Sequence, residues 1–124
     1  MIWAVPLGGA IGASLRYLAG RAAIRAGVSD FASATLAVNV AGSLLIGLVA
    51  VWLVRRGAGD ARLSLFLTTG VLGGFTTFST FSLDTMRLIE GGRFGTAGLY
   101  VIGSVGLGLL AVFAGAALGR SIWP

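Results

Sequence analysis

Four long apolar runs, separated by short charged segments, make up almost the whole chain. They cover about residues 2–25, 31–54, 63–86 and 94–119, and the first run carries its arginines toward its second half. Since about 20 apolar residues cross a bilayer as a helix, each run predicts one transmembrane helix. We therefore expect residues 1–124 to form one all-α membrane domain of four helices.

The composition supports a membrane protein. Hydrophobic residues make up 56% of the chain and charged residues only 10%, with a mean hydropathy of +0.97. Soluble domains carry about a quarter of their residues as charged side chains, so a soluble domain is excluded. Trp3, Trp52 and Trp123 fall near the ends of runs, where interfacial aromatic residues are expected.

The inventory of reactive side chains argues against an enzyme. Histidine and cysteine are absent, which removes the commonest metal ligands and the thiol nucleophile. The acids are Asp30, Asp60, Asp84 and Glu90, and their spacing places them at loops and helix ends rather than in a catalytic pair. The net charge of +5 comes with a pI near 11.5. In a soluble domain this would suggest nucleic acid, but arginines at the ends of apolar runs fit anionic lipid head groups better.

The arginines are almost evenly divided between the two membrane sides. Four helices place Arg55, Arg56, Arg62 and Arg120 on one side and Arg21, Arg25, Arg87 and Arg93 on the other, with Arg16 just inside the membrane. The positive-inside rule needs an asymmetry to choose an orientation. This balance favours dual topology and an antiparallel homodimer. One fixed orientation set by another signal remains the alternative.

Small residues recur at helical spacing. The chain has 21 glycines, and Gly8/Gly12, Gly70/Gly74 and Gly115/Gly119 are each four residues apart. In membranes such pairs let helix backbones approach closely. The pairs therefore predict tight helix packing.

Two runs carry rows of polar residues on one helix face. The second has Thr35, Asn39 and Ser43, and the fourth has Thr96, Tyr100 and Ser104. Asn39 lies about 12 Å along the helix from the start of its run, well inside the membrane. Its amide needs partners there, either on a neighbouring helix or on an anion or water in a pore.

The third run predicts a helix broken in mid-membrane. Gly73-Gly74 precedes Thr76-Thr77, and this combination makes a poor helix interior. Freed backbone groups are tolerated there only inside protein or along a water-filled path. After the break, Phe78 and Phe81 share a face. Their positive ring edges suit an anion, although such rings more often serve packing.

These motifs resemble the Fluc, or CrcB, family of fluoride ion channels. The similarity covers essentially the whole chain, and it is carried by residues 8–17, 39–43 and 70–81 and by Tyr100 with Ser104. The resemblance implies a dual-topology antiparallel homodimer with two fluoride pores, each lined by both subunits. It also implies passive fluoride export across the cytoplasmic membrane of a prokaryote.

The resemblance further assigns residues. Carried over by motif, the fluoride pore residues are Asn39, Phe78, Phe81, Ser79, Thr80, Tyr100 and Ser104. A central sodium ion would be held by the backbone carbonyls of Gly73 and Thr76 from both chains, and oxygen ligands suit this hard cation. Asp84 stands where the family commonly has Glu, so a role that depends on the length of Glu is not carried over.

One pairing follows from topology rather than from resemblance. The first and third runs end on the same membrane side, which brings Arg16 and Asp84 toward one leaflet. We expect an ion pair between them. The alternative is that each side chain reaches the interface separately.

Two other classes of protein compete with a fluoride channel. A small multidrug transporter also has four spans, but its proton-coupled export needs a membrane-embedded Glu in the first, and residues 2–19 contain no acid. An assembly protein without transport would need neither Asn39 in the membrane nor a broken third helix.

Overall fold

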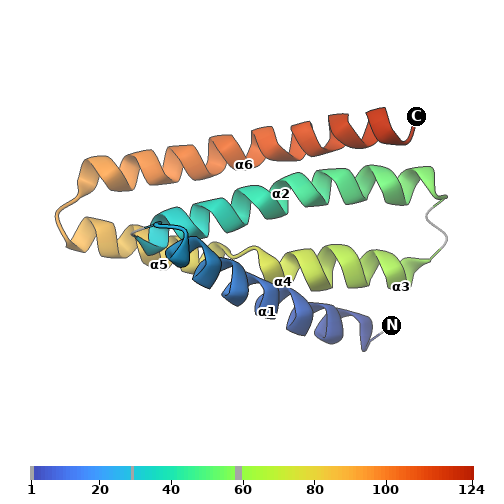
Figure 1. The fold of residues 1–124 in the computed structure, drawn as a ribbon, viewed down its shortest axis with the longest axis horizontal. Coiled ribbons are helices and arrows are strands. Elements are labelled where there is room, and N and C mark those ends of the chain that lie inside the picture. The colour runs from blue at the N-terminus through green and yellow to red at the C-terminus, as the bar shows by residue number, and fades with distance from the viewer. Residues whose placement is uncertain (1, 29, 58–59) are drawn as a thin grey trace.

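Helices cover each of the four predicted runs. The computed structural model describes residues 2–28, 30–57 and 60–124, and this part of the chain contains helices and no strands (Figure 1). The three long helices are α1 (Ala4–Arg25), α2 (Phe31–Arg55) and α6 (Phe94–Ile122). The third run comprises α3 (Ala61–Ser64), the π-helix η1 (Leu65–Leu72), α4 (Gly73–Phe75) and α5 (Phe78–Glu90). The predicted all-α class is confirmed.

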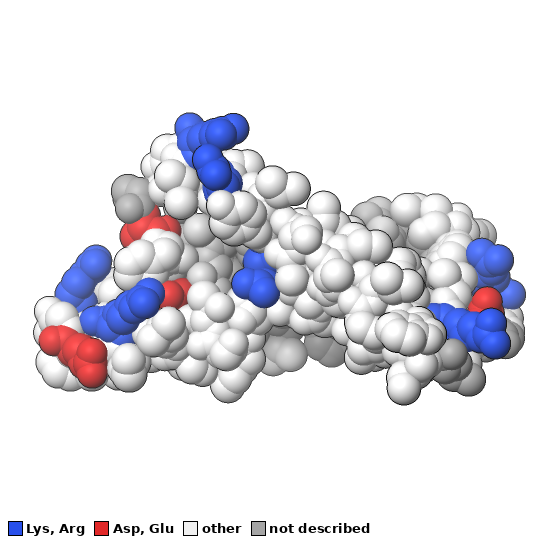
Figure 2. All heavy atoms as spheres, turned by 90° about the horizontal axis from the view of Figure 1, so that it is seen from below, with Lys and Arg blue, Asp and Glu red and all other residues white. Residues whose placement is uncertain are grey.

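Two of the described helices are long and apolar enough to cross a membrane on their own, namely α2 and α6. The arginines of α1 lower its hydropathy, and the third segment is divided into shorter pieces. The start of α1, the end of α2 and the end of α6 all lie at one end of the molecule (Figure 1). Basic side chains gather at both ends, another lies near the middle, and a broad uncharged stretch separates it from the right-hand end (Figure 2).

Local signals set where the helices begin and end. The Ser33 backbone N–H donates to Asp30 Oδ1 at 2.6 Å, which caps α2 and lowers the pKa of this loop carboxyl. Asp60 caps α3 in the same way. Glycines with positive φ follow the ends of α1, α2 and α5, at Gly27, Gly57 and Gly92. This backbone conformation suits glycine and stops a helix.

Glycine lets the helix backbones touch along two seams. The first seam joins α1 to η1 and α4, where a Cβ on Gly12 would meet the Val71 carbonyl oxygen and one on Gly74 would lie 2.7 Å from the Gly9 carbonyl oxygen. The second joins α2 to α6, where a Cβ on Gly115 would meet the Leu44 carbonyl oxygen. The close packing predicted from the paired glycines is confirmed.

The outward face of α6 is strongly apolar. Leu99, Ile102 and Phe113 are all more than 70% exposed. Such a surface needs lipid or another protein to cover it, because water would be an unfavourable neighbour.

We expect Gly12→Ala to lower stability by about 1–3 kcal/mol, the usual cost of forcing extra atoms into a packed site. The new methyl group would collide with rigid backbone rather than with a flexible side chain. Thermal unfolding of the purified protein in detergent measures the effect.

The control is Gly20→Ala on the same helix, where a Cβ meets open space. It should keep or raise stability, because Ala favours helix over Gly by about 1 kcal/mol. Equal transition temperatures for the two variants would contradict the backbone seam.

Candidate functional site

Two residues between α4 and α5 leave the helical conformation. Thr76 has φ −81° and ψ 157°, and Thr77 has φ −150° and ψ 119°, so both are extended. Gly73 stays helical, with φ −64° and ψ −37°. The interruption therefore falls at the threonine pair rather than at the glycine pair that precedes it.

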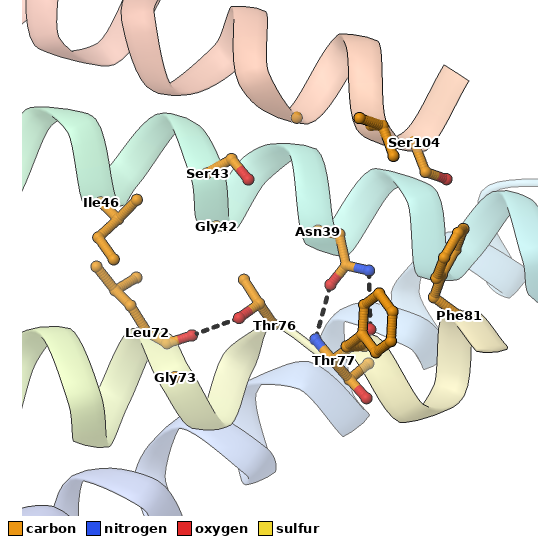
Figure 3. Close-up of a pocket in the computed structure, with 13 residues that line it drawn as sticks. Asn39, Gly42, Ser43, Ile46, Leu72, Gly73, Thr76, Thr77, Phe81 and Ser104 are labelled. Atoms are coloured by element: carbon orange, nitrogen blue, oxygen red, sulfur yellow. Dashed lines mark hydrogen bonds between the residues drawn. The ribbon is translucent and has the colours of Figure 1, made fainter. Parts of the chain in front are cut away.

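The side chain of Asn39 holds this extended segment in place. Its Nδ2 donates to the Thr77 carbonyl at 3.0 Å, and its Oδ1 accepts from the Thr77 N–H at 2.8 Å (Figure 3). The amide thus pairs with the backbone of Thr77 as a neighbouring strand would. This bond links α2 to the third segment, and the second N–H of the amide remains for another acceptor.

The same arrangement diverts donors from two backbone carbonyls. In a continuous helix the Thr77 N–H would serve the Gly73 carbonyl, but it donates to Asn39 instead. Likewise the Thr80 N–H would serve the Thr76 carbonyl, but it donates to Thr77 Oγ1 at 3.2 Å, capping α5. The carbonyls of Gly73 and Thr76 therefore lose their usual helical partners.

Arg16 serves another carbonyl beside the break. Its Nε donates to the Gly74 carbonyl at 3.1 Å in a half-buried position. This contact ties α1 to the end of α4. A guanidinium in this apolar region thus gains a backbone partner.

A cavity of about 350 Å³ lies between α2, α6 and the interruption (Figure 3). Its wall is formed by Asn39, Gly42, Ser43, Ile46, Leu72, Gly73, Thr76, Thr77, Phe78, Phe81, Ser104, Val105 and Gly108. None of these described wall residues is charged. The Ser104 hydroxyl is buried and has no hydrogen-bond partner within the described chain. Buried polar groups are nearly always paired, and this hydroxyl still lacks a partner among the described residues.

A ladder of aromatic rings leads away from the cavity. Phe78 and Phe81 lie 5.5 Å apart between ring centroids at 48°, and Phe81 and Tyr100 lie 5.2 Å apart at 46°. The Tyr100 hydroxyl donates to Asp84 Oδ2 at 3.1 Å, and Asp84 is only 1% exposed. Tilted rings present both edges and faces, and the edges carry the positive end of the quadrupole.

The structure brings together most of the residues that the sequence singled out. Asn39, Phe78, Phe81, Ser104, Gly73 and Thr76 all line the cavity, and Tyr100 packs against Phe81. Thr80 instead lines a second cavity of about 290 Å³ with Arg16, Thr35 and Thr77. Ser79 is exposed, and its Oγ lies 3.3 Å from Thr77 Oγ1.

The expected ion pair between Arg16 and Asp84 is not formed within the described chain. Arg16 bonds the Gly74 carbonyl, and Asp84 bonds Tyr100. The interruption created an acceptor close to Arg16, and α6 brought a hydroxyl to Asp84. Each side chain thus has a partner that the sequence did not predict.

Thr77 and Gly42 also line the cavity, and the sequence-based site residues did not include them. Thr77 is bonded through both its backbone and its side chain. Its backbone N–H and carbonyl pair with the Asn39 side chain, and its hydroxyl oxygen accepts a hydrogen bond from the Thr80 N–H. A Cβ on Gly42 would meet the Thr76 methyl group, so glycine there lets α2 approach the extended segment. The signal for Thr77 was its place one residue before a helix start, where Thr is a favoured cap.

Together, the apolar helices, the interrupted segment and the uncharged polar cavity define a polytopic helical membrane protein with an internal polar site. The chain matches the family model described as CrcB-like protein, Camphor Resistance (CrcB), over residues 3–116. It is 49% identical over 119 residues to the fluoride-specific ion channel FluC of Agrobacterium fabrum, covering 96% of this chain and 95% of the relative. The corresponding protein of Rhizobium etli, with the same name, is 48% identical over 95% of this chain and 94% of the relative. The chain therefore belongs to the CrcB family, as the motifs in its sequence indicated.

Proposed function

We propose that this protein is a fluoride channel that lets fluoride leave the cell passively, without covalent chemistry. The observation that carries the proposal is the cavity, whose uncharged wall combines the neutral donors of Asn39 and Ser104 with the rings of Phe78 and Phe81. Relatives along nearly the whole chain are named fluoride-specific ion channels. Those relatives are bacterial, which supports the cytoplasmic membrane of a prokaryote as its location.

Fluoride would exchange its hydration shell for donors along this path. The free N–H of Asn39 and the hydroxyl of Ser104 supply hydrogen bonds, and the edges of Phe78 and Phe81 supply a weaker positive field. The lining has no positive charge, so the anion would be held weakly enough to leave. Thr80, Ser79 and Tyr100 would continue the polar route beside the rings.

A second copy of the chain would complete the path. Phe78 is 79% exposed in the single chain although it stands on the cavity wall. An antiparallel homodimer would cover this ring, and the near balance of arginines between the two ends supports insertion in both orientations. The interruption would then lie near mid-membrane, with two pores formed by both subunits.

The interruption also suits a structural sodium ion between two copies. The carbonyls of Gly73 and Thr76 have lost their helical donors, and both residues face the cavity. Hard cations prefer such oxygen ligands, so these residues fit the ion. The ion would neutralise carbonyl dipoles at the dimer axis and would take no part in conduction.

Fluoride efflux from vesicles containing the purified protein tests the function. We expect the unmodified protein to release fluoride and Asn39→Ala to slow release about tenfold or more, since a hydrogen bond to a charged group contributes about 1.5–3 kcal/mol. Phe78→Ile should also slow it, because the ring edge is lost. Phe113→Ile is the matched control, because this ring is exposed on α6 and lies outside the cavity wall. Fluoride-tight vesicles made from well-folded unmodified protein would refute the function.

Reporter domains fused to the C-terminus test the orientation. We expect signals from both membrane sides in intact cells, because the arginine balance gives neither orientation an advantage. Adding two lysines after Trp123 serves as a control, since this asymmetry should shift the signal to one side. A signal from only one side for the unmodified chain would contradict dual topology.

Replacing sodium by choline at constant ionic strength tests the sodium site. We expect the thermal transition of the purified protein to fall in choline and to recover when sodium is restored, because an ion that binds only the assembled state stabilises it. Gel filtration of the same samples should show less dimer in choline. An unchanged transition and unchanged dimer content would rule out the sodium site.

A further inference from the structure

Another groove lies between the later halves of α2 and α6, and Ile46 is common to its wall and to the wall of the cavity at the interruption. Its volume is about 560 Å³, and its wall is formed by Ile46, Gly47, Ala50, Val51, Val54, Arg55, Val112, Ala116 and Arg120. All of the wall is apolar except for two arginines. Both arginines belong to the last turns of their helices, and these turns lie at the same end of the molecule (Figure 1).

The positive charge at this end has little acidic compensation. This end carries four arginines and one acidic side chain. The acid is Asp60, whose carboxylate caps α3, and the arginines are Arg55, Arg56, Arg62 and Arg120. No salt bridge joins an arginine to a carboxylate side chain within residues 2–28, 30–57 and 60–124. Arg55 Nε donates a hydrogen bond to the Trp123 carbonyl at 3.0 Å. This bond orients the guanidinium and leaves its terminal N–H groups for another acceptor. Both groove arginines are exposed.

Aromatic residues place this end at the level of lipid head groups. The Arg56 guanidinium lies 5.1 Å from the centre of the Trp52 ring, and Trp123 follows the end of α6. Tryptophan is enriched at the membrane interface. The two groove arginines therefore stand at head-group depth, while the apolar wall extends toward the membrane interior.

We propose that this groove binds an anionic phospholipid, with Arg55 and Arg120 holding its phosphate and one acyl chain lying along the apolar wall. Guanidinium groups bind phosphate through paired N–H donors, which favours this ligand at an arginine pair. The surplus positive charge favours a lipid with net negative charge over a zwitterionic one. The groove shares Ile46 with the cavity wall but none of the polar side chains of the proposed fluoride path.

Lipid retention by the full-length protein tests the proposal. The protein is equilibrated in detergent with phosphatidylglycerol or phosphatidylcholine, and bound lipid is counted by native mass spectrometry. We expect a preference for phosphatidylglycerol and about 30-fold weaker binding in the double variant Arg55→Gln/Arg120→Gln, from the contribution of each arginine near an anionic lipid. The matched control is Arg87→Gln/Arg93→Gln, which removes the same charge from the opposite end and should retain the lipid. Equal retention in the two double variants, whether high or low, would overturn the site.

A second variant tests the apolar part of the groove while keeping both arginines. Ala50 is exposed on its wall, so Ala50→Phe should fill it and weaken binding of phosphatidylglycerol while leaving fluoride efflux intact. Unchanged lipid binding in this variant would overturn the assignment. So would competition by inorganic phosphate, because the site would then bind a free anion. A loss of dimer with unchanged lipid binding would show that another copy of the chain covers the groove.

Discussion

The contact between the Asn39 side chain and the Thr77 backbone is the constraint on which the site depends. An extended residue inside an apolar helix bundle exposes an N–H and a carbonyl, and leaving either unpaired costs about 1–3 kcal/mol. One amide satisfies both, at 2.8 and 3.0 Å. Since the amide belongs to α2, it also fixes the distance between α2 and the interrupted segment. The cavity exists because these two segments are held together at one point.

The consequences of this contact spread along the third segment. With the Thr77 N–H committed to Asn39, the helix cannot continue, and a new helix must begin at Phe78. The Thr77 hydroxyl caps that helix, which sets the rotation of α5. This rotation brings Phe81 between Phe78 and Tyr100. The aromatic ladder thus depends on where α5 begins as well as on the three-residue spacing of Phe78 and Phe81.

The sequence predicted the helices and their packing faces better than it predicted which side chains contact one another. Paired glycines gave the packing seams, because four-residue spacing defines a helix face regardless of its neighbour. The interruption was expected from Gly73-Gly74, yet glycine costs a helix only about 1 kcal/mol per residue, and packing against α1 outweighs that cost. Arg16 and Asp84 acquired partners on α4 and α6 that only the folded chain brings near. The π-helical hydrogen bonds of η1 had no evident signal in the sequence.

The two glycine seams also restrict how this chain can change over generations. Every amino acid other than glycine has a Cβ, so any missense mutation at Gly12 or Gly115 places an atom where a carbonyl oxygen already lies. The exposed face of α6 has no such restriction, because its large side chains have room to vary. Genetic drift would therefore be concentrated on the outward surface, while the paths of the helix backbones stay almost fixed.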